Sequence, residues 1–100
     1  MMNAAKTPSL DDAEMLAIRA LGFLARDADR LGRFLTLTGI GPSELRARAG
    51  EPGLLTAVLE HLLSDETLLL VFATEDAVPP AAIAAAHGAL ADPAGTARRR

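Results

Sequence analysis

The sequence predicts an all-α protein, folded as a single compact irregular bundle of five or six short helices. Half of the 100 residues are hydrophobic, and 21 of these are Ala and 17 are Leu, which are the strongest helix formers. Only six Val and Ile residues are present, so few positions favour a strand. The apolar residues recur at helical spacing between Gly, Pro and acidic residues, which is typical of short helices joined by tight turns.

Two helices are expected in the first 40 residues. The first covers residues 10–26, because Ser9 is a suitable N-cap and acidic residues follow it in the first turn. Its expected buried stripe is Leu10, Ala13, Ala17, Leu21 and Leu24. Asp27 is expected to cap a second helix that ends at Gly39. The buried stripe of this second helix is Leu31, Phe34, Leu35 and Thr38.

The third helix is expected to be short, since Pro42 suits a first helical position and Gly50 suits a helix end. Its inward residues are Leu45 and Ala49. Pro52 opens a fourth helix with a broad apolar face, which indicates that this helix is central to the core. That face consists of Leu54, Leu55, Val58, Leu59, Leu62 and Leu63.

Ser64 is the expected N-cap of a fifth helix over residues 67–75, and two acidic residues follow it. The apolar run at residues 68–72 is also compatible with a buried strand, because short apolar runs are ambiguous by period. Its Leu content and the preceding cap favour a helix. Pro79 and Pro80 begin the last helix. One side of this helix carries Ile83, His87 and Leu90.

The domain organisation follows from these elements. We expect a flexible N-terminus at residues 1–8, one helical domain at 9–91 and a disordered basic tail at 92–100. The absence of Cys excludes disulfides and Cys-ligated zinc. No apolar segment follows Lys6, and the longest apolar run is far shorter than the roughly 20 residues that span a bilayer. The expected location is therefore the cytoplasm, with no membrane contact.

No catalytic, metal-binding or cofactor-binding pattern stands out. His61 with Glu60 and Asp65 could form a weak divalent-cation site, but such a cluster is more often a solvated helix face. The serines at 9, 43 and 64 fall near helix starts, where capping accounts for them. We therefore predict that the protein is not an enzyme, and that it has no catalytic, metal or cofactor residues and takes no cofactor.

The stretch from Gly39 to Gly41 resembles the phosphate-binding loop of helix-hairpin-helix proteins, in which backbone amides and a helix N-terminus hold a phosphate. Leu45 stands where that family has a small residue, and the net charge of −3 is opposite to that of most phosphate-binding domains. A helix stop at Gly39 followed by a helix start at Pro42 is the simpler interpretation. Nucleic-acid binding through this loop and the arginine-rich half is the alternative function.

Charge is divided between the two halves of the chain. Residues 19–48 hold six Arg and three acidic residues, whereas residues 49–97 hold seven acidic residues and no Lys or Arg. The halves can pair within one molecule, at small energetic value, or between molecules. The candidate partner surface is Arg26, Arg30, Arg33, Arg46 and Arg48. We expect a protein partner or a homodimer and no nucleic acid, so the leading hypothesis is a non-catalytic protein-interaction or self-associating domain.

Several segments resemble a family of small alphaproteobacterial proteins, the domain of unknown function 3572, over residues 13–90. The segments are Ala20-Leu21, Phe23-Leu24-Ala25, Arg33-Phe34-Leu35, Thr38-Gly39, Leu45-Arg46, Val58-Leu59 and Leu68-Leu69. Family members have Asp-Pro at helix starts, where this chain has Asp27-Ala28, Gly41-Pro42 and Glu51-Pro52. An acidic residue at position 41 would repel a phosphate, so the resemblance supports the helix stop. It implies no reaction, ligand or functional residue.

Overall fold

The computed structural model describes residues 8–92, and within that range the chain forms six helices and no strand. The all-α prediction is confirmed, including a helix at residues 68–72. The helices are α1 (Leu10–Ala25), α2 (Ala28–Thr38), α3 (Pro42–Arg48), α4 (Pro52–Leu63), α5 (Glu66–Glu75) and α6 (Pro80–Ala91). The flexible terminus and basic tail predicted at 1–8 and 92–100 lie, except for Pro8 and Asp92, outside the described residues.

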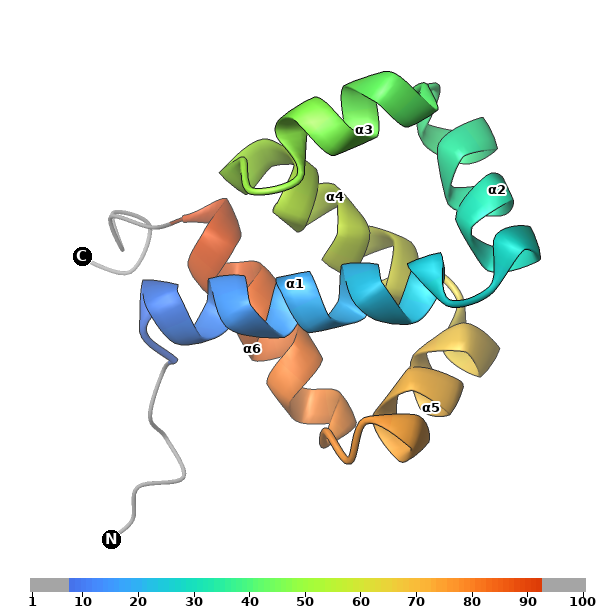
Figure 1. The fold of residues 1–100 in the computed structure, drawn as a ribbon. Helices are drawn as coiled ribbons and strands as arrows, with labels where there is room; N and C mark the ends of the chain where they lie inside the picture. Colours follow the sequence, from blue (N-terminus) through green and yellow to red (C-terminus); the bar gives the residue numbers. More distant parts are fainter. Residues whose placement is uncertain (1–7, 93–100) are drawn as a thin grey trace, which may run out of the picture.

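Three helices form the centre of the fold. α1 lies across α4 and α6, which also pack against each other (Figure 1). α2 packs on α1 and α4, and α5 packs on α4 and α6. α3 links α2 to α4 and has no fully buried residue. The short connections between helices keep these neighbours close, as the capped turns of the sequence indicated.

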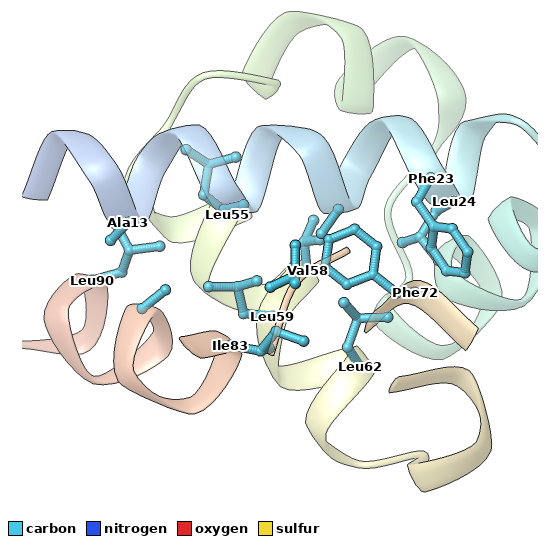
Figure 2. Close-up of a cluster of buried hydrophobic side chains, with 14 of the residues drawn as sticks. Ala13, Phe23, Leu24, Leu55, Val58, Leu59, Leu62, Phe72, Ile83 and Leu90 are labelled. Atoms are coloured by element: carbon cyan, nitrogen blue, oxygen red, sulfur yellow. The ribbon is translucent and has the colours of Figure 1, made fainter. Parts of the chain in front are cut away.

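The core is filled by aromatic and leucine side chains from several helices. Phe23 of α1 and Phe72 of α5 lie with ring centroids 5.2 Å apart and ring planes tilted by 57° (Figure 2). Val58 and Leu59 of α4 lie between α1 and α6 in the same view, and both are fully buried. The apolar face predicted for α4 is confirmed, although Leu63 at its edge is only half-buried.

The stripe predicted for α1 was wrong at Leu10, which is exposed. Leu21 is half-buried and packs against the edge of the core. The buried residues are Ala13, Ala17, Ala20, Phe23 and Leu24. Three alanines on this face allow the axis of α1 to lie close to α6, whose buried side also carries alanines. The interface between the two helices therefore contains small residues, whereas the prediction had favoured the larger leucines.

α2 buries less than predicted. Of its expected stripe, Phe34 is fully buried, Leu31 and Leu35 are half-buried, and Thr38 is exposed. The Thr38 hydroxyl donates a hydrogen bond of 2.8 Å to the backbone oxygen of Phe34. This bond to the preceding turn satisfies the hydroxyl locally, so Thr38 has no role in the core. Leu45 and Ala49, predicted to point inward from α3, are both half-buried.

The predicted cap of α5 was wrong by one residue. Asp65 is the N-cap, and its carboxylate accepts a hydrogen bond of 3.1 Å from the backbone N–H of Leu68. Ser64 instead ends α4 and donates its hydroxyl proton to the carbonyl of His61 at 2.9 Å. A carboxylate at the cap also interacts favourably with the positive end of the helix dipole, which explains why Asp65 takes this position. The caps predicted at Ser9 and Asp27 are confirmed.

Truncating Phe34 or Leu59 to Ala is expected to lower the free energy of unfolding by about 2–5 kcal/mol, because each leaves a cavity in the core. Urea unfolding followed by circular dichroism measures the change. Thr36→Ala, at an exposed position of α2, is the control and is expected to change it by less than about 0.5 kcal/mol. An unchanged midpoint for either core variant would contradict the packing of α2 and α4.

The turn between α5 and α6 holds an alanine in the left-handed region. Ala77 has φ 55°, the one positive φ outside glycine among the described residues. The N–H of Val78 donates to the carbonyl of Ala73, and the N–H of Asp76 donates to that of Phe72, both at 2.9 Å. The first of these bonds is the long bond of a Schellman helix ending, in which glycine normally occupies the left-handed position.

Ala77→Gly is expected to raise the free energy of unfolding by about 1 kcal/mol, because glycine adopts this backbone conformation without steric cost. Gly39→Ala makes the reverse exchange at φ 75° and should lower the free energy of unfolding by a similar amount. A Cβ at this position meets no atom within 4 Å, so the effect comes from the backbone conformation alone. Gly41→Ala at φ −85° is the control, with little change expected, because the entropic gain of alanine is offset by its poorer N-capping of α3. Denaturant unfolding of the three variants measures these changes, and destabilisation by Ala77→Gly would contradict the described turn.

Candidate interaction surface

The middle of the outer face of α1, opposite its buried face, is apolar, and no helix among residues 8–92 packs on it. Met15 is 63% exposed and Ile18 is 49% exposed. Gly22 and Ala25 are also exposed and continue the same helix face, because the four positions are three, four and three residues apart. In Figure 1, α1 runs across the front of the molecule and no helix covers it. We call Met15, Ile18, Gly22 and Ala25 the α1 strip.

Charges of opposite sign border the two ends of the α1 strip. Asp11 and Asp12 lie in the first turn of α1, followed by Glu14. Arg19 and Arg26 lie in the second half of the helix and at its C-cap. Sequence analysis did not identify this surface, although a signal was present: Met15 and Ile18 are large apolar residues that fall outside the predicted buried stripe.

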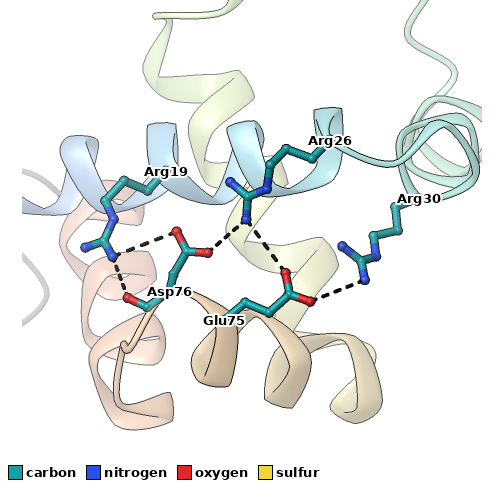
Figure 3. Close-up of polar contacts among 5 residues, drawn as sticks. All are labelled: Arg19, Arg26, Arg30, Glu75 and Asp76. Atoms are coloured by element: carbon teal, nitrogen blue, oxygen red, sulfur yellow. Dashed lines mark hydrogen bonds and ion pairs between the residues drawn. The ribbon is translucent and has the colours of Figure 1, made fainter.

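The basic end of α1 contacts the C-terminal end of α5 (Figure 3). Nη2 of Arg26 lies 3.0 Å from Oδ1 of Asp76 and 3.8 Å from a carboxylate oxygen of Glu75. Arg19 donates to the backbone oxygen of Asp76 at 2.6 Å, and Arg30 of α2 lies 3.9 Å from Glu75. Positive side chains at a helix C-terminus interact favourably with its carbonyl groups. These arginines therefore join α1 and α2 to α5, although each exposed ion pair contributes only about 0–1 kcal/mol.

The five arginines predicted as a partner surface have different environments. Arg26 and Arg30 belong to the contact with α5, so for them the two charged halves pair within one molecule. Arg48 forms hydrogen bonds with two glutamates close to it in the sequence. Arg33 and Arg46 form no ion pair within residues 8–92. The structure therefore uses three of the five in intrachain contacts.

The glycine loop has the geometry of a helix stop. Gly39 has φ 75° and its N–H donates to the carbonyl of Leu35 at 2.9 Å. The N–H of Ile40 points to the hydroxyl oxygen of Thr38 at 3.4 Å. Because two amides of the loop already donate within the chain, this arrangement favours the predicted stop over a phosphate-binding loop.

His61 is more buried than predicted for a solvated cluster with Glu60 and Asp65. Its side chain is 8% exposed, and its ring meets the ring of Phe34 nearly edge-on with centroids 5.2 Å apart. Nε2 of His61 has no hydrogen-bond partner. Glu60 instead lies 3.1 Å from Nε2 of His87, across the interface of α4 and α6. α2 packs over this end of α4, which covers His61 and explains the difference.

Two of the surface hollows lie beside residues considered above. One of about 390 Å³ is beside His61 and is lined by Arg33, Leu37, Ser64, Asp65, Glu66 and Thr67. The other, of about 460 Å³, lies between α1, α6 and the turn before α6, and is lined mainly by small apolar residues with Asp12 and Arg19. Within residues 8–92, no group of three or more His, Asp or Glu side chains is arranged to hold a metal ion.

Lowering the pH below about 6.5 is expected to destabilise the protein through His61. Burial lowers the pKa of His61; the carboxylate of Asp65 raises it and the guanidinium of Arg33 lowers it. The unfolded chain therefore binds a proton at a higher pH than the folded chain, so stability falls as the pH drops through the unfolded pKa. Urea unfolding between pH 7.5 and pH 5 tests this, and these pH limits bracket the ordinary value of about 6.5.

The comparison for this test is His61→Leu, which should remove part of the pH dependence. His87→Gln is the control, because it also removes one histidine. In this variant the loss of stability that His61 causes at low pH should remain. If the free energy of unfolding changes equally with pH in the parent and in His61→Leu, His61 does not contribute to the pH dependence.

In the described part of the chain, no single helix is long and apolar enough to cross a membrane. α5 and α6 together meet that test on length and composition, but they are bent by 106° relative to each other.

Comparison with known proteins gives one match. A family model described as "Protein of unknown function (DUF3572)" matches residues 10–93 and confirms the resemblance found from the sequence. The matched range includes the whole α1 strip. No curated protein and no solved structure matches the chain.

Proposed function

We propose that this chain, which belongs to the DUF3572 family, is a non-catalytic domain that binds another protein through the α1 strip. The observation that carries the proposal is the pair Met15 and Ile18, both large, apolar and about half exposed or more, on a helix face whose charged residues, Asp11 and Arg26, lie at its two ends. Apolar surface with a polar rim is typical of protein-binding sites, and the acidic and basic ends of α1 supply such a rim.

Two other exposed leucines do not form a comparable surface. Leu37 of α2 is 65% exposed, but it lines a hollow with Arg33, Ser64 and Asp65. Leu70 of α5 is 47% exposed and lies with the half-buried Val71 between Thr67, Thr74 and Glu75. Each offers one exposed large apolar side chain among polar or charged neighbours, whereas the α1 strip joins two exposed large apolar residues with two small ones.

The shape of the α1 strip indicates the kind of partner. Its small residues occupy the half next to Arg26, and its large residues occupy the half next to the acidic turn. A helix of 16 residues is about 24 Å long, so the strip offers a straight surface one helix wide. Such a surface fits the apolar face of another helix, because side chains of one helix pack into the grooves of the other.

Site-specific photocrosslinking in cells of the source organism tests the proposal. A photoreactive phenylalanine analogue is placed at position 18, and the control carries it at position 36, on the exposed face of α2. We expect position 18 to give discrete adducts heavier than the 10.4 kDa chain. The apolar contact should bring a partner atom within reach of the probe only at that position.

The control defines what counts against the proposal. Adducts of the same pattern from position 36 would show unspecific collision. No adduct from position 18 would show that the α1 strip has no protein partner under the conditions of growth.

A further inference from the structure

We infer that the partner is a second copy of this chain, whose α1 packs antiparallel on the α1 strip. The two-fold axis that relates the copies passes midway between Ile18 and Gly22 along the helix. The inference rests on the proposed function, because it names the occupant of the same surface. Three features of α1 carry it: the order of large and small residues, an otherwise unexplained glycine, and the distribution of charge along the helix.

The order of residues in the α1 strip is self-complementary in the antiparallel orientation. The spacing of three, four and three residues is that of the contact positions in paired helices. With the two-fold axis at the stated level, Ile18 faces the partner's Gly22 and Met15 faces the partner's Ala25. Each layer then holds one large and one small side chain, so both helices fill the space between them without overcrowding.

No contact within residues 8–92 requires a glycine at position 22. Gly22 lies inside α1, its φ is not positive, and a Cβ built on it would meet no atom within 4 Å. Glycine inside a helix is unfavourable relative to alanine, because it loses more conformational freedom on folding. A close approach by Ile18 of a second copy would give this glycine a packing role. Gly88 inside α6 has equally open surroundings and lies outside the strip, which makes it a matched control.

The charges of α1 favour the antiparallel orientation over the parallel one. Asp11 and Asp12 lie at one end of the helix and Arg26 at the other. At this register Arg26 of each copy lies two residues from the level of the partner's Asp12, and the two copies of Arg19, each bound to Asp76 of its own chain, lie near the two-fold axis. Parallel packing instead places the two acidic turns together. Arg26 contacts Asp76 and Glu75 of its own chain through one nitrogen, Nη2, and a guanidinium has five N–H donors, so further donors remain for the partner's carboxylates.

The expected dimer is weak. At this register the two copies of α1 overlap over residues 15–25, which is about 16 Å, so the contact lies at or below the low end of specific interface sizes. We therefore expect dissociation in the micromolar range, with weaker association at high salt because the end charges are exposed. Apolar contact at Met15 and Ile18 keeps the association from vanishing.

Sedimentation equilibrium of the full chain at tens of micromolar tests the dimer. We expect the parent to approach twice 10.4 kDa and Gly22→Gln to remain near 10.4 kDa. Because Gln is a better helix former than Gly, Gly22→Gln should melt at the same temperature as the parent or higher once dilution has separated both into monomers. Gly88→Gln shares the gain in helix propensity and should remain dimeric, so a loss of mass with Gly22→Gln cannot come from unfolding.

Disulfide crosslinking tests the orientation. The sequence contains no cysteine, so an introduced cysteine is the one thiol in the protein. A mixture of Met15→Cys and Ala25→Cys proteins should form the mixed disulfide under mild oxidation, since these positions face each other. Met15→Cys alone should crosslink poorly, because the two copies of position 15 lie about 15 Å apart along antiparallel axes. Parallel packing would give a disulfide between two copies of Met15→Cys and no mixed disulfide between positions 15 and 25. That result would overturn the inference.

A parent that stays monomeric at every concentration overturns the inference, as does a dimer unaffected by Gly22→Gln. The photocrosslinking experiment separates this failure from failure of the proposed function. A monomeric purified chain whose position 18 crosslinks to other proteins in cells leaves the proposed function in place. A monomeric chain with no crosslink from position 18 overturns both.

Discussion

Close packing of α1 on α6 and α4 is the interaction on which the rest of the structure depends. The chain has only three aromatic residues, so it cannot fill wide gaps between helices with large side chains. Alanines on the inner face of α1 solve this problem by bringing the helix axes together, while the leucines of α4 fill the space that remains. The consequence is a core three helices wide, in which α1 is buried on one side only.

Two of the remaining helices, α2 and α5, contact the C-terminal half of α1, and α5 packs also on α4 and α6. Phe23 packs on Phe72, and Arg19 and Arg26 bind the C-terminal end of α5 at Asp76. The contacts hold α5 beside α1 and fix the turn at Ala77 that leads into α6. They also pair, within one molecule, arginines that the charge pattern offered to a partner, although Arg26 uses only one nitrogen for this contact. What remains free on α1 is its apolar outer face, and this is why the proposed binding surface differs from the predicted arginines.

The order of the helices could be predicted because their ends are encoded locally. Ser9 and Asp27 cap helices through bonds to amides two or three residues away, and Gly39 ends a helix because it adopts a positive φ. At the start of α5 the predicted cap, Ser64, and the observed cap, Asp65, are adjacent residues of similar capping ability, so the sequence did not distinguish them. Interactions over so few residues are visible in the sequence and depend little on the rest of the fold.

Burial could be predicted only where one helix face is uniformly apolar, as in α4. The exposure of Leu10 and the burial of Ala20 depend on which side of α1 meets α6, and the burial of His61 depends on α2 crossing α4. The sequence by itself determined the helical class, the sequence of helices and their caps, since these follow from local propensity and hydrogen bonding. The tertiary structure alone decided which residues of α1 face solvent, because that depends on contacts between segments far apart in the chain.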